Sequence, residues 1–527
     1  MRVNLPFEVL YILHLLNQHG FPGFLVGGAV RDLIMGAAPQ NIKDYDFTSA
    51  ATPETIQKIL AKSFYENQFG TVSIAHQNLL ELIAEKHQLP TINLAQLSLE
   101  EKTNETKIID LKKATKIHFS LQDKLPKQTE TISNTNQYFP PFEITTFRSD
   151  GQYLDHRRPE TISYGQNIET DLSRRDFTIN ALALAINPQV LEAIFQNKVL
   201  QSTYLIEPTD AQLIDLYQGQ KDIQKKIVRT VGNPDQRFTE DALRMLRAVR
   251  LAVQLKMDIA TETYFAIKFH HHLLKFVSFE RIRDEFLKIL ASDDPRKGIE
   301  MLDQTALLQH IIPELYAGVE MQQRGHHTTD VWTHSLDALH YCPSKDPIVR
   351  LATLIHDIGK PPAYKEENQE ITFYNHEVLG SRMASKIANR LKLSKKDVQR
   401  IFILVRYHMF HYQENHSDAS IRRFIKRVGF ENIDDLLDLR EGDRLGSGAK
   451  KTSWRLEEMK QRIIEQLNQP MDLHDLAIDG HVLMEELNLQ PGPVLGKILN
   501  KLLEKVLENP DLNSKTQLLI EAKKLLD

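Results

Sequence analysis

Two aspartates in the segment Ile42-Lys43-Asp44-Tyr45-Asp46-Phe47 have the residue type and spacing that most directly suggest chemistry. Side chains on a strand point the same way at every second residue, so we expect Asp44 and Asp46 to share one face of a strand over residues 42–47. Two hard carboxylates on one face suit a pair of Mg²⁺ ions, which can activate an attacking hydroxyl and steady a leaving phosphate. An isolated Asp-x-Asp pair is more often a solvated strand end, so the surrounding residues decide between the two interpretations.

A glycine turn lies upstream, in Val26-Gly27-Gly28-Ala29-Val30-Arg31-Asp32, between a short apolar strand and a helix. Gly27 and Gly28 allow backbone N–H groups to approach a phosphate closely, and a helix N-terminus favours the negative charge. Arg31, one turn into the helix, is placed to clamp phosphate. Glu143, on a strand expected over residues 142–148, is a candidate third carboxylate at the metals. The glycine turn and the two aspartates together predict a site that binds a phosphate and metal ions.

Histidines and aspartates form a second constellation in the middle of the chain. Its members, in order, are His334, His356, Asp357, His376, His408 and Asp443. Neutral imidazole and carboxylate suit divalent transition metals, and two metals need about this many ligands. The competing interpretation is a helical domain that has kept its fold and lost the chemistry.

The elements that must position these residues predict an α+β fold. The first 180 residues mix helices and strands, as expected of an α/β head on a small sheet, and helical periodicity dominates after about residue 170. Helices are expected over residues 6–18, 241–255, 284–290, 331–341, 349–356 and 396–408. Polar residues without clear periodicity between about 77 and 140 indicate a flexible insertion, with one short helix near its start.

Length and composition limit the class of protein. The chain has 527 residues, with 65 Lys+Arg against 70 Asp+Glu, which predicts roughly three or four domains. A content of 41% hydrophobic and 26% charged residues excludes a collagen-like, wholly disordered or disulfide-stapled chain. One cysteine, Cys342, cannot form an internal disulfide, so we expect a cytoplasmic protein. No segment has the roughly 18 apolar residues of a membrane helix.

The glycine turn and the two aspartates resemble the head of the class II nucleotidyltransferases, which comprise the CCA-adding tRNA nucleotidyltransferases and the related bacterial poly(A) polymerases. The resemblance continues through nearly the whole chain except the insertion. Its further motifs lie at residues 171–181 (DLSRRDFTINA), 237–250 (RFTEDALRMLRAVR) and 479–513. It implies two-metal transfer of a nucleotide to the 3′-hydroxyl of an RNA end, with Mg²⁺ as the cofactor.

Asp241 and Arg244 lie three residues apart on the expected helix over 241–255, and therefore on one face. Asp offers two acceptor oxygens and Arg a fork of donors, which suits reading the edge of a nucleotide base. In the family, the matching pair acts as a protein template for CTP and ATP. We expect Glu240 to orient Arg244 or a neighbour. By resemblance, nucleotide contacts are also expected of Arg175, Arg247 and Arg250.

The second constellation resembles the HD-domain phosphohydrolases. In that family the first histidine, the His-Asp pair and the final aspartate hold one metal, which corresponds here to His334, His356, Asp357 and Asp443. Additional histidines complete a second metal site in the binuclear members, which corresponds here to His376 and His408. Some CCA-adding enzymes carry such a domain, with phosphatase and 2′,3′-cyclic phosphodiesterase activity.

The leading hypothesis is therefore addition of the 3′-terminal CCA to tRNA from CTP and ATP, with a phosphohydrolase that uses a divalent transition metal. The expected partner is the tRNA acceptor end, with no membrane and no obligate protein partner. A close alternative is a poly(A) polymerase, or a relative adding only C or only A. An HD hydrolase of nucleotides with a nucleotide-sensing head is an alternative of another class, and a non-catalytic RNA-binding scaffold is a third. The expected domains are a head (1–180, with the insertion at 77–140), a helical neck and body (181–320), an HD domain (321–450) and an RNA-binding tail (451–527).

Overall fold

A computed structural model describes most of the chain. The described residues are 2–67, 70–87, 140–150, 162–165, 167–196, 201–321, 329–367, 370–410, 412–413, 416–451 and 453–526. The expected insertion lies outside them from residue 88 to residue 139. At its start, helix α4 (His76–His87) takes the place of the short helix expected there. In the described part of the chain, no helix is both long and apolar enough to cross a membrane.

A seven-stranded sheet forms the head, in the strand order β11-β9-β2-β3-β6-β5-β4. These strands are β2 (Gly23–Val26), β3 (Asp46–Ser49), β4 (Phe64–Asn67), β5 (Thr71–Ile74), β6 (Phe142–Thr146), β9 (Leu182–Ile186) and β11 (Ala211–Asp215). Strands β3 and β6 run parallel, whereas the other neighbours are antiparallel. The parallel pair lies at the middle of the sheet, so the residues at its ends come from distant parts of the sequence.

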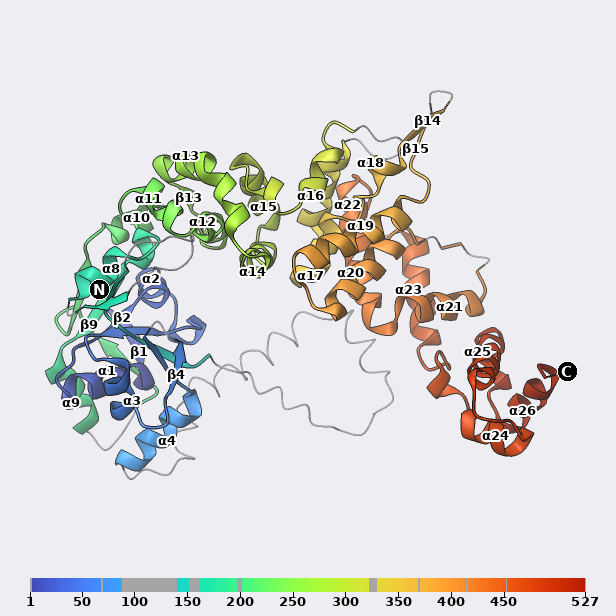
Figure 1. Cartoon of the computed structure of the whole chain (residues 1–527), viewed down its shortest axis with the longest axis horizontal. Coiled ribbons are helices and arrows are strands. Elements are labelled where there is room, and N and C mark those ends of the chain that lie inside the picture. The colour runs from blue at the N-terminus through green and yellow to red at the C-terminus, as the bar shows by residue number, and fades with distance from the viewer. Residues whose placement is uncertain are drawn as a thin grey trace. The chain divides into compact units, whose positions relative to one another are not determined.

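Helices around the sheet bury its apolar side chains. They are α1 (Phe7–Gln18), α2 (Gly28–Ile34), α3 (Pro53–Ile59), α4, α8 (Ile168–Ser173) and α9 (Pro188–Gln196). Helix α1 is buried from Phe7 to Leu16, because it packs against both β2 and α9. Helix α3 begins with residues suited to a helix N-terminus: the Thr52 hydroxyl accepts a hydrogen bond from the backbone N–H of Thr55, and Pro53 occupies the first turn. Figure 1 shows this mixed head at the blue end of the chain.

The chain forms two compact units. Among the described residues, the first runs from the N-terminus to Ile289 and includes Glu300–His310, and the second consists of Leu290–Ile299 and Ile311–Asp527. The first unit adds helices to the head, namely α10 (Gly219–Lys225), α11 (Pro234–Glu240), α12 (Leu243–Gln254), α13 (Thr261–His270) and α14 (Phe279–Leu290). Strands β12 (Ile227–Val228) and β13 (Asp258–Ile259) pair in parallel beside them. The expected α+β class is confirmed.

The second unit is built mainly of helices, which Figure 1 shows as a bundle around α16, α17, α19, α20 and α22. Its helices are α16 (Val331–Tyr341), α17 (Pro347–Leu354), α18 (Lys360–Ala363), α19 (His376–Arg390), α20 (Lys395–Tyr407), α21 (Asp418–Val428), α22 (Ile433–Gly446), α23 (Trp454–Gln466), α24 (Gly480–Leu487), α25 (Pro493–Glu508) and α26 (Lys515–Lys524). Helix α16 packs on α22, and α17 packs on both α20 and α22. A separate apolar cluster joins α24, α25 and α26.

Candidate active sites

Asp44 and Asp46 lie at the N-terminal end of strand β3, in the middle of the head sheet. The strand begins at Asp46 rather than at residue 42, so the expectation that both aspartates sit within one strand is wrong. Asp44 is exposed in the segment leading into the strand, and Asp46 is partly buried at its first position. Glu143 is paired in parallel register with Asp46, so the two side chains project from the same face of the sheet. The three carboxylates therefore lie near the N-terminal ends of the two central strands, β3 and β6.

The glycine turn lies beside Asp46 because β2 and β3 pair through Val26 and Asp46. Gly27 has a φ of +76°, which disfavours other residues. A Cβ added there would lie 3.0 Å from Arg175 Nη1 and 3.6 Å from Asp46 Oδ2. Backbone, guanidinium and carboxylate therefore meet at one point, as a site for a nucleotide phosphate and its metal requires.

Arg31 is held at the same end of the sheet, on helix α2. Its Nη1 donates to Asn180 Oδ1 at 2.7 Å, and its Nη2 pairs with Asp32 Oδ1 at 2.7 Å. The guanidinium is therefore fixed before any phosphate binds. Its contacts are compatible with the expected clamp, and that role stays a prediction.

Asp171, a fully buried carboxylate in helix α8, orients the arginines that follow it. Its Oδ1 accepts from Arg174 Nη2 at 2.6 Å and its Oδ2 from Arg175 Nη2 at 3.2 Å. Burial alone would raise the pKa of Asp171, but the two guanidinium groups outweigh that effect and hold the pKa below its ordinary value. Near Asp46, burial raises the carboxyl pKa, Arg175 opposes the rise and Asp44 adds to it. A bound cation would relieve this repulsion between the two carboxylates.

The next residue, Asp176, connects the head to helix α12. Its Oδ2 pairs with Arg247 Nη2 at 2.7 Å. Burial would raise the pKa of Asp176, but Arg247 and Arg244 together hold it below its ordinary value. The motif of residues 171–181 thus places Arg175 beside Asp46 and Asp176 beside helix α12. The motif therefore links the carboxylates at the start of β3 and β6 to the residues expected to read the base.

Asp241 and Arg244 do not share a helix. Helix α11 ends at Glu240, Asp241 has an extended backbone (φ −144°, ψ 104°), and helix α12 begins at Leu243. The expected helix from residue 241 is therefore wrong by two residues. The Asp241 carboxylate caps α12 instead, because its Oδ1 accepts from the backbone N–H of Leu243 at 3.1 Å. The second carboxylate oxygen, Oδ2, takes no part in this hydrogen bond.

Arg244 is buried at the start of α12 and firmly held. Its Nη1 pairs with Glu240 Oε2 at 2.6 Å, which confirms the expectation that Glu240 orients it. Its Nη2 lies 3.4 Å from the carbonyl oxygen of Arg174. Arg250, further along the helix, pairs with Glu285 at 2.6 Å. The arginines of α12 are thus fixed by acidic partners, and their contacts with nucleotide stay predictions.

Arg281 of helix α14 is a residue that the sequence reasoning missed. Its Nη2 pairs with Asp241 Oδ2 at 2.7 Å. With Leu243 on one oxygen and Arg281 on the other, both oxygens of Asp241 have an orienting donor. Forty residues separate the partners in the chain, so spacing gave no signal of the contact.

We expect Arg281→Gln to weaken the choice between nucleotides more than the rate of transfer. Loss of the 2.7 Å pair frees the Asp241 carboxylate to turn, and discrimination by hydrogen bonding depends on fixed partners. The ratio of CTP to UTP incorporation should fall about tenfold, corresponding to roughly 1.4 kcal/mol. Steady-state incorporation of each nucleotide into a tRNA transcript measures this. The matched control is Arg283→Gln on the same helix, because the Arg283 guanidinium pairs with its neighbour Asp284. An unchanged ratio in Arg281→Gln would contradict the positioning role.

The residues of the second constellation converge in the second unit, and they come from five different parts of it. His334 comes from α16, His376 begins α19, His408 follows α20 directly and Asp443 lies in the last turn of α22. His356 and Asp357 lie just after α17. All are buried. The sequence predicted this set, and the structure brings all six members together.

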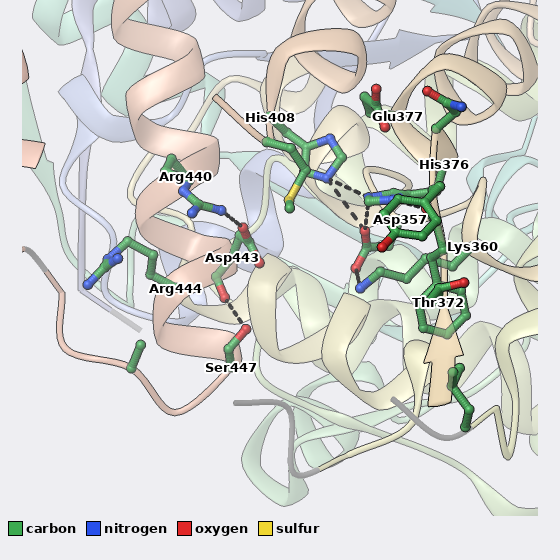
Figure 2. A pocket seen from close by; sticks show the side chains of 16 residues that line it. Asp357, Lys360, Thr372, His376, Glu377, His408, Arg440, Asp443, Arg444 and Ser447 are labelled. Atoms are coloured by element: carbon green, nitrogen blue, oxygen red, sulfur yellow. Dashed lines mark hydrogen bonds and ion pairs between the residues drawn. The ribbon is translucent and has the colours of Figure 1, made fainter. Parts of the chain in front are cut away.

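Asp357 lies between two groups of donor atoms. Its Oδ2 is 3.5 Å from His334 Nε2 and 3.3 Å from His356 Nε2. Its Oδ1 is 3.4 Å from His376 Nε2 and 3.5 Å from His408 Nε2. Asp443 joins the first group, with Oδ1 3.2 Å from His334 Nε2. Figure 2 shows Asp357 between its neighbours His376 and His408.

The spacing of these atoms fits metal ions. Two nitrogen ligands about 2.05 Å from one tetrahedral ion lie about 3.3 Å apart, and the Nε2 atoms of His334 and His356 are 3.2 Å apart. Those of His376 and His408 are 3.4 Å apart. The charges agree as well: burial would lower the pKa of His356, but Asp357 and Asp443 raise it to about 10. This environment favours a cation.

Backbone carbonyls orient three of the histidines in the same manner. The Nδ1 atoms of His356, His376 and His408 lie 2.7, 2.8 and 2.8 Å from the carbonyl oxygens of Thr353, Phe373 and Val405. In each case the acceptor is three residues upstream. An Nδ1–H that donates to a carbonyl leaves Nε2 with a lone pair, which is the form that ligates a metal. Burial also lowers the pKa of His408 and so favours its neutral form.

A cavity of about 750 Å³ opens onto these ligands. It is lined by Asp357, His376, His408 and Asp443, and also by three cations that the sequence reasoning missed: Lys360, Arg440 and Arg444. Lys360 Nζ pairs with Asp357 Oδ2 at 2.5 Å and Arg440 Nη1 with Asp443 Oδ2 at 2.5 Å. Cations beside a metal site suit the oxygens of a phosphate ester.

Three family models match the chain. The poly A polymerase head domain matches residues 23–125 and 108–229, the probable RNA and SrmB-binding site of polymerase A matches residues 256–318, and the putative tRNA nucleotidyltransferase domain 2 matches residues 366–522. The crystal structure of the Bacillus stearothermophilus CCA-adding enzyme in complex with CTP is similar in fold, with a TM-score of 0.62 and 22% identity. That likeness covers 99% of this chain and 97% of the other.

Relatives in sequence agree with these models. The CCA-adding enzyme of Ligilactobacillus salivarius (strain UCC118) is 28% identical, over 99% of this chain and 98% of that protein. In other relatives named CCA-adding enzymes, the similarity spans only 55% to 57% of the relative's length. The A-adding tRNA nucleotidyltransferase of Deinococcus radiodurans (strain R1) is 32% identical, over 63% of this chain and 74% of that protein. Together with the motifs of the head, these matches show that the chain belongs to the family of tRNA nucleotidyltransferases and bacterial poly(A) polymerases.

Proposed function

We propose that this protein adds the 3′-terminal CCA to tRNA, using CTP and ATP. The observation that carries the proposal is the continuous set of contacts from the carboxylates to the base-reading residues: Arg175 beside Asp46, Asp176 on Arg247, and Arg244 against the Arg174 carbonyl. A triphosphate held at the glycine turn could therefore present its base to Asp241 and Arg244. The names of the relatives, which include CCA-adding and A-adding enzymes, agree with this substrate class.

The residues divide the work of transfer. Asp44 and Asp46 would hold Mg²⁺, which when bound lowers the pKa of the attacking hydroxyl and offsets charge on the leaving group. Arg175, fixed by Asp171, faces the phosphates. The 3′-hydroxyl oxygen of the RNA bonds to the α-phosphorus, the bond from that phosphorus to the bridging oxygen of the β-phosphate breaks, and pyrophosphate leaves. The hydroxyl proton goes to solvent, so no protein nucleophile is required.

The test is incorporation into a tRNA transcript that lacks its 3′ end, with Mg²⁺ and labelled CTP, ATP or both. We expect two C additions with CTP, followed by one A when ATP is also present. A transcript that already ends in CCA is the control and should gain nothing. A long A ladder, or addition of one kind of nucleotide only, would overturn CCA addition in favour of a poly(A) polymerase or a partial-activity relative.

We further propose a metal-dependent phosphohydrolase at the second site. The observation that favours it is Asp357, which presents one oxygen to His334 and His356 and the other to His376 and His408. A divalent transition metal held there would supply a hydroxide nucleophile at neutral pH. Lys360 and Arg440, beside the ligands, would then face the phosphate. Hydrolysis adds water to a 2′,3′-cyclic phosphate: the water oxygen bonds to phosphorus, one ribose oxygen leaves, and that oxygen takes a proton.

The direct assay is hydrolysis of adenosine 2′,3′-cyclic phosphate after loading with Ni²⁺, Mn²⁺, Co²⁺ or Mg²⁺. We expect turnover with at least one transition metal and its loss after chelation. A protein that binds these metals but turns over neither this ester nor a phosphomonoester would contradict the proposal. The alternative of a nucleotide-sensing head predicts hydrolysis without any nucleotide incorporation.

A further inference from the structure

A second cavity adjoins the one that opens onto the metal ligands. It has a volume of about 430 Å³, within the roughly 300–1,000 Å³ of small-molecule sites. Glu377 and Met409 line both cavities. The Met409 side chain is 52% exposed, and Glu377 forms an ion pair with Arg406 at 3.3 Å. These two side chains therefore mark the boundary between the cavities.

The lining of the second cavity combines aromatic rings with guanidinium groups. Its rings are those of Tyr407, Phe410, His416 and Phe424, and its arginines are Arg406, Arg423 and Arg427. Glu377 is the single carboxylate residue among the lining residues. Phe410 and Phe424 lie 5.5 Å apart with their planes inclined at 56°, so they offer two ring surfaces at different angles. Proteins that bind single-stranded nucleic acid combine such rings for the bases with cations for the backbone.

The cations of this cavity are not equally available. Arg423 is neutralised by Glu508 and Glu504 of helix α25, and Arg406 by Glu377. Arg427 is exposed, and within the described part of the chain it forms no ion pair with an acidic side chain. Since its helix also carries Phe424, α21 presents a ring and an available cation to the same cavity.

We infer that this second cavity binds the penultimate nucleotide of an RNA strand, so that the metal site acts on RNA ends in preference to mononucleotides. The inference rests on the proposed phosphohydrolase. A terminal cyclic phosphate would lie at Lys360 and Arg440, in the larger cavity. The strand would pass Glu377 and Met409, and the preceding base would stack on Phe424 with its phosphate near Arg427.

The test compares two substrates, adenosine 2′,3′-cyclic phosphate and the dinucleotide adenylyl-adenosine 2′,3′-cyclic phosphate, on the metal-loaded full-length protein. One stacked base contributes about 1–3 kcal/mol, which corresponds to a kcat/KM at least about fivefold higher for the dinucleotide. Phe424→Ala and Arg427→Gln should each bring the ratio of the two kcat/KM values toward one. Phe430→Ala and Arg455→Gln are the matched controls, because both residues are exposed on other elements and line neither cavity.

Equal kcat/KM for the two substrates in the unaltered protein would overturn the inference and leave the phosphohydrolase intact. Hydrolysis of neither substrate would instead contradict the phosphohydrolase, and binding would then decide the inference. Calorimetric titration with adenylyl-adenosine 3′-phosphate and with adenosine 3′-phosphate should give at least about fivefold tighter binding of the dinucleotide. Equal affinities would overturn the inference. An unfolded Phe424→Ala would leave Arg427→Gln, whose side chain is exposed, to provide the variant test.

Discussion

Replacement of Asp46 by asparagine is expected to reduce nucleotide incorporation at least about 10³-fold. The substitution keeps the side-chain volume but removes the anionic carboxylate that we propose binds metal beside Arg175, and metal stabilisation of a transfer step amounts to several kcal/mol. Burial raises the pKa of Asp46 and Asp44 adds to the rise, so the neutral amide should fold without strain. Incorporation of labelled CTP into the shortened transcript measures the loss.

Asp284→Asn is the control for this substitution, since Asp284 is half-exposed on helix α14 and pairs with its neighbour Arg283. Asp46→Asn should leave hydrolysis of adenosine 2′,3′-cyclic phosphate unchanged, because Asp46 and Asp357 belong to different compact units. A variant that keeps more than a tenth of the incorporation rate would contradict the role given to Asp46. The same experiment on Glu143→Gln decides whether the third carboxylate takes part.

Asp357→Asn is expected to abolish hydrolysis and to lower the metal content, while nucleotide incorporation persists. Both carboxylate oxygens of Asp357 face histidines, at 3.3 to 3.5 Å. Burial opposes ionisation of Asp357, yet His356 and Lys360 hold its pKa well below the ordinary value, so the carboxylate is anionic at neutral pH. An amide offers one neutral oxygen in its place. Elemental analysis after metal loading should show less than half the metal of the unaltered protein.

The control for the second substitution is Asp434→Asn, an exposed aspartate on the same helix as Asp443. Chelation of the unaltered protein should also lower its thermal midpoint, because the buried carboxylates of Asp357 and Asp443 would lose their shared cation. The control and the unaltered protein should respond alike to chelator. Full metal content in Asp357→Asn would contradict the role of Asp357, because the ions would then be held by other ligands.

Regular elements with a strong pattern could be predicted from the sequence. The helix expected over residues 331–341 has those bounds, and the first helix begins one residue later than expected. The helical periodicity after residue 240 favoured one helix, but the Asp241 side chain accepts a hydrogen bond from the backbone N–H two residues ahead and so competes with helical hydrogen bonding. The helix break between Glu240 and Leu243 is such a local effect, which periodicity does not register.

The candidate sites could be predicted where the residue type alone identifies a possible metal ligand. Six acids and histidines in a fixed order indicated the metal set, whereas Arg281 gave no signal because its partner lies forty residues away. Arg440 could have been found, since it lies one helical turn before Asp443 on α22. The domain boundaries and the roles of the individual site residues stay predictions.

Three of the histidines proposed to bind metal are oriented by main-chain carbonyls, those of Thr353, Phe373 and Val405. A carbonyl belongs to every amino acid, so no substitution at these three positions deletes the acceptor itself. The identity of the orienting residue is therefore free to drift in evolution, provided that the local turn persists. Searches for distant relatives of this site should weigh the three-residue offset to each of these histidines, and not the residue types that supply it.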